Sequence, residues 1–358
     1  MLKRIQSKIQ TKKKFLEKMR AHSKSVAITN EVHDLDEFDF ATQILEYGYY
    51  LVLGKRRSGK TTMSRLISQH TARHKTAQHI VIAGNENIKE DWAEIVHPFY
   101  IHEGYSIDGK TKDASADIAI SALDQIIKEQ QRRVRECKIL GVPFPEEWKV
   151  ILFIDDCGTI KKFMHSAQMK WLASNGRQIK ADIFVIIQKL THACTESREG
   201  ADGVMCLQTA HDVTIKSLHK EYVSTIPLKL FQTVLAGATQ NRGMLIINAH
   251  PQQHNIKYML FFSHADFLHS DGFKGKLEHV ASEAHWQYAI EHYKPPISQL
   301  QSDNKHCVTT RKLDEDTDDD EPQAAVTAET PHFTGDTFIQ GTMQLKFKRK
   351  PHSAAAAA

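Results

Sequence analysis

Short, continuous runs of apolar residues alternate along this chain with longer segments in which apolar residues recur every three or four positions. The runs predict buried strands, and the periodic segments predict helices. Strands are predicted at residues 49–53, 79–83, 99–101, 149–156, 182–187, 203–207, 244–247 and 257–262, the last two as a closing hairpin. Helices are predicted at residues 63–74, 86–96, 114–137 and 161–173, with two more inside 214–237 that are separated at Pro227. This alternation predicts an α/β domain with a mostly parallel sheet flanked by helices.

The turn between the first predicted strand and the first predicted helix has the spacing of a phosphate-binding loop. Gly54 and Gly59 enclose four residues, and Lys60 and Thr61 follow directly, which matches G-x-x-x-x-G-K-[ST]. Backbone N–H groups of such a loop form an anion nest, and the following helix adds its positive dipole end. A chance glycine-rich turn is the alternative, which the flanking strand and helix disfavour. The residues expected to bind the nucleotide are Gly54, Lys55, Arg56, Arg57, Ser58, Gly59, Lys60, Thr61 and Thr62.

A second informative stretch is the apolar run 149–154, which ends in Asp155 and Asp156. A buried parallel strand with acids at its carboxyl end places them beside the nucleotide, as in a Walker B motif. Asp155 is expected to hold Mg²⁺ together with the Thr61 hydroxyl, while Lys60 contacts the β- and γ-phosphates of ATP. Asp156 is expected to polarise the attacking water, and a plain turn or helix N-cap residue is the alternative.

Gln188 stands at the end of the next apolar run, 182–187. An amide at the tip of a strand beside the Asp155 strand can hydrogen-bond both the γ-phosphate and the attacking water. Such a residue suits a sensor that couples hydrolysis to movement. A strand-end glutamine without a catalytic role is the alternative.

Composition indicates an ordinary soluble, intracellular protein. Hydrophobic residues make up 41% and charged residues 25% of the 358 positions, and the formal net charge is +4. No apolar run approaches the ~20 residues that span a bilayer, and the start lacks a secretory apolar region. The five cysteines are scattered without a C-x-x-C pair, so we expect reduced thiols and neither a disulfide frame nor a zinc site. His70 and His74 lie one helical turn apart, where a solvated helix face is favoured over a metal site.

The two ends of the chain differ from its middle, which is the predicted ATPase domain, residues 31–294. Residues 1–30 are basic with interleaved apolar positions, which suits an amphipathic helix that binds nucleic acid, an acidic protein surface or a membrane surface. A solvated leader without a specific partner is the alternative. Residues 295–358 contain an acidic block at 314–321 and a basic end, and predict a disordered tail.

Around these motifs the chain resembles the FtsK–HerA superfamily of DNA-translocating ATPases, and within it the poxvirus-type genome-packaging ATPases of large DNA viruses. The resemblance covers residues 49–207. Three features depart from the family pattern. Gln178 stands where the viral proteins often have His, and Arg56 and Arg57 make the loop more basic than in many relatives. Asp156 stands where the cellular pumps commonly have Glu, a change that the viral branch tolerates. The residues that carry the resemblance are Gly54–Thr62, Ile154-Asp155-Asp156-Cys157, Asn175-Gly176-Arg177, Gln188, and Arg198 shortly before Asp202.

The resemblance implies a RecA-like P-loop core, assembly into a homo-oligomeric ring, and ATP-driven movement of double-stranded DNA into a viral capsid. The implied partners are double-stranded DNA and a capsid or portal-vertex protein, and the implied location is the viral factory of the host cytoplasm or the virion. In such rings a neighbour's arginine completes the charge on the γ-phosphate. Arg177 and Arg198 match the family positions. Arg198 is slightly favoured, since Arg177 could equally serve as a structural or cis contact.

Two other functions fit parts of the pattern. A nucleotide-gated DNA-binding switch would bind ATP and turn it over slowly, but the acid at position 156 argues for turnover. A terminase-like motor would add a nuclease domain with clustered carboxylates, and the residues after Leu207 offer no convincing strand-end trio of acids. An ATP-driven DNA translocase therefore leads.

Overall fold

The computed structural model describes residues 33–40, 42–71, 76–105, 112–209, 211–251, 256–263, 280–293, 337–340 and 343–348. The basic N-terminal segment, His74 and most of the predicted tail lie outside the described residues. Within the described part of the chain, no helix combines the length and the apolar character needed to cross a membrane.

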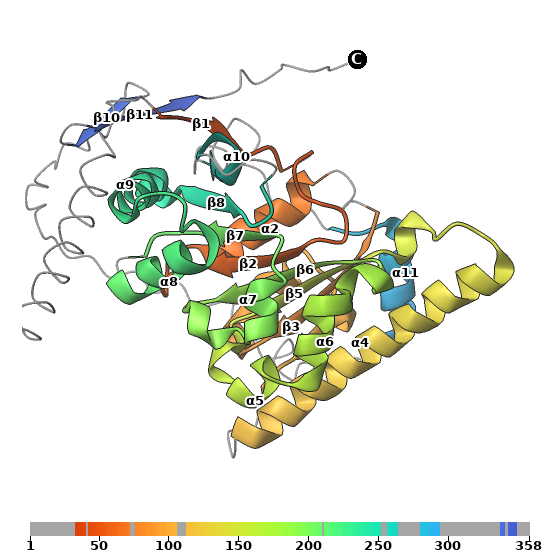
Figure 1. The fold of residues 1–358 in the computed structure, drawn as a ribbon. Helices are drawn as coiled ribbons and strands as arrows, with labels where there is room; N and C mark the ends of the chain where they lie inside the picture. Colours follow the sequence, from red (N-terminus) through yellow and green to blue (C-terminus); the bar gives the residue numbers. More distant parts are fainter. Residues whose placement is uncertain are drawn as a thin grey trace, which may run out of the picture.

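One sheet runs through the molecule, with the strand order β10-β11-β1-β9-β8-β7-β2-β6-β5-β3-β4 (Figure 1). In the run β7-β2-β6-β5-β3-β4, each strand is parallel to the next one. β8 is antiparallel to both β7 and β9. This confirms the predicted α/β class with a mostly parallel sheet. The strands are β1 (His33–Glu37), β2 (Tyr49–Leu53), β3 (Gln78–Ala83), β4 (Ile101–Glu103), β5 (Val150–Asp155), β6 (Ala181–Ile187), β7 (Gly203–Cys206), β8 (Met244–Asn248), β9 (Leu260–Ser263), β10 (Thr337–Gln340) and β11 (Met343–Lys348).

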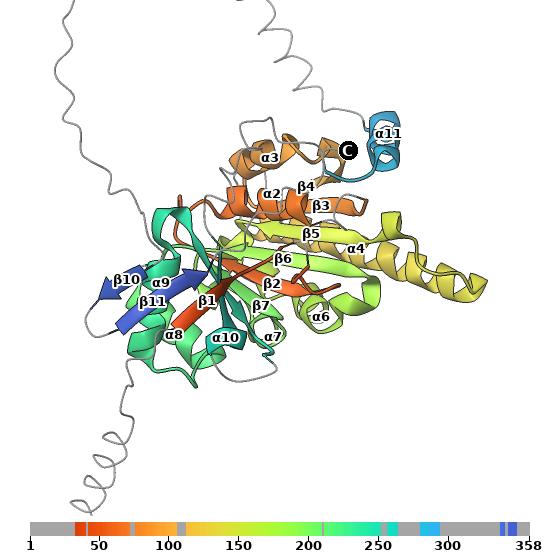
Figure 2. The ribbon, with the colours of Figure 1, turned by 90° about the horizontal axis from the view of Figure 1, so that it is seen from above.

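Helices cover both faces of this sheet (Figure 2). Helices α2, α3 and α11 pack on one face, and α4, α5, α6, α8 and α9 pack on the other. The helices are α2 (Lys60–His70), α3 (Glu86–Ala93), α4 (Lys112–Leu140), α5 (Lys161–Met164), α6 (Ala167–Asn175), α7 (Thr195–Glu199), α8 (Asp212–Tyr222), α9 (Leu228–Ala238), α10 (Ile256–Met259) and α11 (Glu283–His292).

The central strands are buried on both faces, which explains their continuous apolar runs. Every residue of β2, β3, β5 and β6 is buried. Successive side chains alternate between the two cores, so Leu51 and Leu53 pack on the α4 side while Tyr50 and Val52 pack on the α2 side. The strands are thereby held in a single register.

That register brings four strand ends to one edge of the sheet. Ala83 pairs with Asp155, Asp155 pairs with Ile186, and Leu53 pairs with Ile187. Because β3, β5, β6 and β2 are parallel, their carboxyl ends lie side by side. The residues that follow these ends are Gly84, Asp156, Gln188 and Gly54.

Some predicted elements differ in extent from the observed ones. The hairpin of β8 and β9 is confirmed, but residues 257–259 of its predicted second strand belong to the helix α10. Pairing between β8 and β9 runs from Met244 opposite Ser263 to Ile247 opposite Leu260, so residues 257–259 do not pair with β8. The predicted helix 161–173 is two helices, because Ser166 adopts an extended conformation and caps α6 through Met169 N–H.

Three strands extend the sheet beyond the predicted set. β1 pairs in parallel with β9 and lies in a segment where no strand is predicted from the sequence. β11 pairs in parallel with β1, and β10 pairs with β11 in antiparallel fashion. Both β10 and β11 come from within the predicted tail.

Candidate functional site at the carboxyl edge of the sheet

The loop from Gly54 to Gly59 connects β2 directly to α2, which begins at Lys60. Gly54 N–H donates to the carbonyl oxygen of Ile187 at 3.3 Å, which ties the start of the loop to β6. A Cβ at Gly54 would lie 2.5 Å from Ser58 Oγ, and Gly59 has a left-handed φ of 88°. Both positions therefore need glycine, and the loop curls tightly before the positive end of α2.

Lys60 is a largely buried cation at this helix start. The residue is 9% exposed, and its Nζ donates to the carbonyl oxygen of Lys55 at 3.0 Å. Burial lowers the pKa of its ammonium group, while the nearby carboxylates of Asp155 and Asp156 act in the opposite direction. An anionic ligand in the loop would find this charge already fixed in place.

Asp155 is a buried carboxylate at the end of β5, only 1% exposed. Its Oδ2 accepts hydrogen bonds from Thr61 Oγ1 at 2.9 Å and from Trp92 Nε1 at 3.0 Å. Burial raises the pKa of Asp155 to about 6, and these two hydrogen bonds limit the rise. A hydroxyl and a carboxylate in contact are hard oxygen donors, so this pair fits Mg²⁺.

Asp156 is held by one amide on each side. Its Oδ1 accepts from Gln188 Nε2 at 2.9 Å, and its Oδ2 accepts from Asn85 Nδ2 at 2.8 Å. The Asp156 backbone has a left-handed φ of 56°, uncommon for a residue with a side chain. The three side chains form a row across the ends of β3, β5 and β6.

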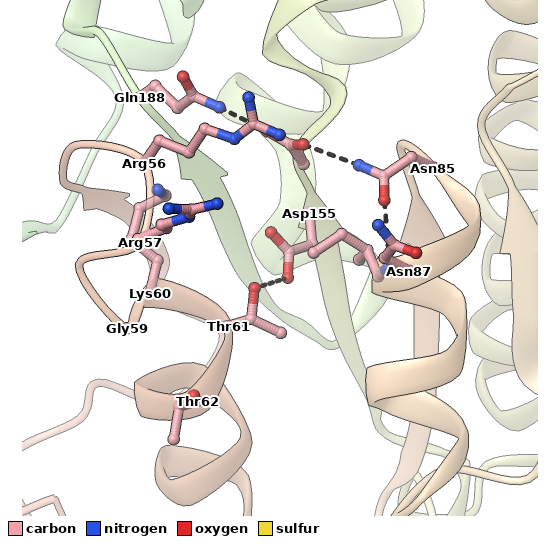
Figure 3. Close-up of a pocket in the computed structure, with 12 residues that line it drawn as sticks. Arg56, Arg57, Gly59, Lys60, Thr61, Thr62, Asn85, Asn87, Asp155 and Gln188 are labelled. Atoms are coloured by element: carbon pink, nitrogen blue, oxygen red, sulfur yellow. Dashed lines mark hydrogen bonds between the residues drawn. The ribbon is translucent and has the colours of Figure 1, made fainter.

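These groups surround one pocket of about 410 Å³ (Figure 3). Cations, hydroxyls, amides and carboxylates all line it, so it offers both anion-binding groups and oxygen ligands for a metal. Its lining residues are Arg56, Arg57, Gly59, Lys60, Thr61, Thr62, Asn85, Asn87, Ile88, Asp155, Asp156 and Gln188. The structure thus assembles in one place the loop, the acid pair and the glutamine that the sequence singled out separately.

Arg177 and Arg198 do not line this pocket. Arg177 lies in a short 3-10 helix, Gly176–Ile179, before the amino end of β6, and its Nη2 donates to Asp202. Arg198 lies in α7, and its Nη1 donates to Glu221 at 2.6 Å. Within this chain, each arginine is paired with a carboxylate away from the phosphate-binding loop.

Asn85 and Trp92 were not identified from the sequence, although both bond to the acid pair. Asn85 follows β3 and caps α3, because its Oδ1 accepts from Ile88 N–H at 3.1 Å. An Asn directly before a helical segment was the only local signal. Their contact with the acids depends on β3 lying beside β5, which is a tertiary feature.

Comparisons with known proteins give relatives of low sequence identity. No protein-family profile matches the chain. In sequence it is similar to "Uncharacterized protein 015R" of Frog virus 3 (isolate Goorha), with 22% identity over 239 residues. The match covers 67% of this chain and 66% of that protein, so the chain spans slightly less than two thirds of its relative.

Two solved structures match part of this chain at low identity. The genome packaging NTPase B204 from Sulfolobus turreted icosahedral virus 2, in complex with ATP-gammaS, is 13% identical with a TM-score of 0.39, over 60% of this chain and 96% of that one. The cytoplasmic domain of the Thermomonospora curvata type VII secretion ATPase EccC is 10% identical with a TM-score of 0.43, over 63% of this chain and 27% of that one. Both overlaps are partial.

Proposed function

We propose that this chain is a Mg²⁺-dependent ATPase motor of the FtsK–HerA type, which moves double-stranded DNA and packages a viral genome. The observation that carries the ATPase is the contact of Thr61 Oγ1 with Asp155 at 2.9 Å, directly beside Lys60 and the Asp156–Gln188 pair. These groups come from three different parts of the chain, and a P-loop hydrolase needs all of them in one pocket.

Each group has a definite task in this proposal. The loop N–H groups and Lys60 bind the phosphates. Thr61 and Asp155 would hold Mg²⁺, and a bound Mg²⁺ would supply positive charge that neutralises the phosphates. Asp156 orients the attacking water and accepts its proton on a carboxylate oxygen, and Gln188 holds that carboxylate in place.

Coupling to DNA and assembly into a ring are supported by the sequence resemblance. A motor must hold each successive step of the duplex, so we expect it to contact phosphates and not base edges. Binding should therefore be independent of sequence. With six to ten phosphate contacts, the affinity should fall about 10³- to 10⁵-fold between ~50 and ~200 mM salt.

The deciding experiment is steady-state ATP hydrolysis with and without linear double-stranded DNA. We expect Mg²⁺-dependent turnover that DNA stimulates, and no turnover in Lys60→Ala, whose circular dichroism should match that of the wild type. Tight ATP binding with little turnover, even with DNA, would favour a nucleotide-gated switch instead. Cleavage of the DNA would favour a terminase-like enzyme, and a wild type that binds no ATP would refute the ATPase itself.

A further inference from the structure

The Asp156 carboxylate has a second holder besides Gln188. Asn85 Nδ2 donates to Oδ2 of Asp156 at 2.8 Å, whereas Gln188 occupies the other oxygen, Oδ1. Asn85 and Gln188 both line the pocket and lie on opposite sides of it (Figure 3). Each carboxylate oxygen is thus fixed by an amide from a neighbouring strand end.

Asn85 also begins a helix. It adopts an extended conformation as the N-cap of α3, and its Oδ1 accepts from Ile88 N–H at 3.1 Å. The same amide therefore uses its oxygen for the helix and its nitrogen for the acid. This orientation leaves the Asn85 side chain no freedom to rotate without losing one of the two bonds.

The backbone around Asn85 fixes the distance to Asp156. A Cβ at the preceding residue, Gly84, would lie 2.3 Å from the carbonyl oxygen of Asp156. Gly84 N–H donates to the carbonyl oxygen of Asp155 at 2.8 Å. Only glycine permits this approach, so the strand ends of β3 and β5 stay locked together beside the pocket.

Helix α3 contacts both acids of the pair. Its cap residue Asn85 holds Asp156, and Trp92 from its last turn donates to Asp155 at 3.0 Å. Lys89 of α3 also forms an ion pair with Glu103 of β4 at 2.7 Å. A displacement of α3 would therefore disturb the metal-binding acid and the water-orienting acid together.

We infer that Asn85 is a positioning residue, which fixes the Asp156 carboxylate and links α3 to ATP hydrolysis at this site. The inference rests on the proposed ATPase function. The inference predicts that substitution of Asn85 lowers kcat and leaves ATP binding unchanged. Asn85 contacts Asp156, whereas the phosphates are bound by the loop.

Two substitutions separate this role from helix capping. Asn85→Ser keeps a capping oxygen but has no amide to reach Asp156, and we expect kcat to fall about 10- to 100-fold with little change in KM for ATP. Asn85→Asp also keeps the cap, but it places a second carboxylate where the donor was. We expect a larger loss of kcat at pH 7.

The split between kcat and KM is the readout that a purely structural role would not give. Both variants remove the bond from Asn85 Nδ2 to Asp156 Oδ2 but leave the phosphate-binding loop and Lys60 unaltered. Loss of this bond should therefore lower kcat at an unchanged KM for ATP, whereas a general distortion of the pocket would raise KM as well.

Ser166→Ala is the matched control, since Ser166 caps α6 through Met169 N–H and does not line the pocket. It should lower the melting temperature slightly and leave kcat and KM unchanged. Wild-type kcat in both Asn85 variants, or a fall in kcat that is matched by a rise in KM, would overturn the inference. If Asn85→Asp fails to fold, Asn85→Ser decides alone. A wild type that neither binds a fluorescent ATP analogue nor hydrolyses ATP would instead refute the proposed function.

Discussion

The burial of Asp155 opposes the charged form of its carboxyl group in the absence of a ligand. The proposed metal-binding role requires a charged carboxylate, but the side chain is buried and its pKa is raised to about 6 from 3.8. Between these two values the folded protein keeps a proton that the unfolded chain releases. The stability contributed by Asp155 is therefore complete below about pH 4 and is lost as the pH rises through about 6.

Replacing the Asp155 carboxyl by an amide should remove this loss of stability at high pH. Asp155→Asn keeps an oxygen that can accept from Thr61 and Trp92, so we expect a gain of up to about 3 kcal/mol in the free energy of unfolding at pH 8 and no gain at pH 4. Urea unfolding without nucleotide and metal measures both values. An equal gain at the two pH values would show that packing, and not ionisation, is responsible. The same variant should lose Mg²⁺-dependent hydrolysis.

Asp156 should affect chemistry without affecting binding. We expect Asp156→Asn to bind ATP and Mg²⁺ normally and to hydrolyse ATP about 10²- to 10⁴-fold more slowly, because the amide cannot accept the proton of the water. Single-turnover hydrolysis and equilibrium binding together test this. Asp124→Asn is a suitable control, since Asp124 forms an exposed pair with Lys128 on α4. Normal turnover in Asp156→Asn would remove Asp156 from the mechanism.

Motif spacing was enough to identify five residues that the structure places together. Asp155, Asp156 and Gln188 stand at or directly after the end of an apolar strand, so local sequence marks them. Lys60 and Thr61 begin the helix that follows the glycine-bounded loop, which marks them in the same way. Asn85 also follows a strand. Its role could not be predicted, because a strand-end Asn before a helix has a sufficient local explanation as a cap, and its contact with Asp156 depends on strand order.

At the scale of secondary structure, the contact between the ends of β3 and β5 sets the shape of the pocket. Gly84→Ala would force the new methyl group against the Asp156 carbonyl oxygen, now 2.3 Å from an ideal Cβ. We expect a loss of about 1–3 kcal/mol in the free energy of unfolding, and a loss of kcat because Asn85 and Asp156 move apart.

A second glycine provides the control for stability alone. Gly141 ends α4 with a φ of 65°, and an added Cβ would meet no atom within 4 Å. Gly141→Ala should cost about 1–2 kcal/mol through its left-handed backbone, without changing kcat. If Gly84→Ala is destabilised to the same degree but stays fully active, the close approach is not needed for catalysis.

The strands that stand out most clearly in the sequence are those buried on both faces. β2, β3, β5 and β6 are entirely buried and therefore read as unbroken apolar runs. β1 has the sequence His-Asp-Leu-Asp-Glu, of which Leu35 is fully buried, so its pattern resembles an acidic loop. Its strand conformation comes from pairing with β9, a partner more than two hundred residues away in the chain.

At the scale of the whole molecule, the positions of four arginines bear on how subunits of the proposed ring would cooperate. Arg177 and Arg198 lie outside the pocket of their own chain and pair with Asp202 and Glu221. Arg56 and Arg57, in contrast, line the pocket from the phosphate-binding loop itself. If Arg177 or Arg198 contributes to hydrolysis, we expect it to do so at a neighbour's pocket, where it would exchange its carboxylate partner for a phosphate.

Mixing of inactive subunits tests whether Arg177 or Arg198 acts at a neighbour's pocket, unlike Arg56 and Arg57, which line the pocket of their own chain. If Arg198 acts in trans, Lys60→Ala and Arg198→Ala subunits each keep what the other lacks, and an equal, random mixture should recover about a quarter of the wild-type interfaces in a closed ring. ATPase activity of the mixture, compared with each variant alone, measures this recovery. The same test applies to Arg177→Ala.

Arg56→Ala is the control for that experiment, because Arg56 and Lys60 belong to the same pocket. In a mixture of Arg56→Ala with Lys60→Ala every pocket still carries one defect, so activity should not exceed that of Arg56→Ala subunits alone at the same concentration. Mixtures that stay inactive for both Arg177→Ala and Arg198→Ala would exclude both arginines from a role in trans. Full activity of a purified monomer would exclude the ring itself. A pocket that hydrolyses ATP fully without a neighbour does not require an arginine from another subunit.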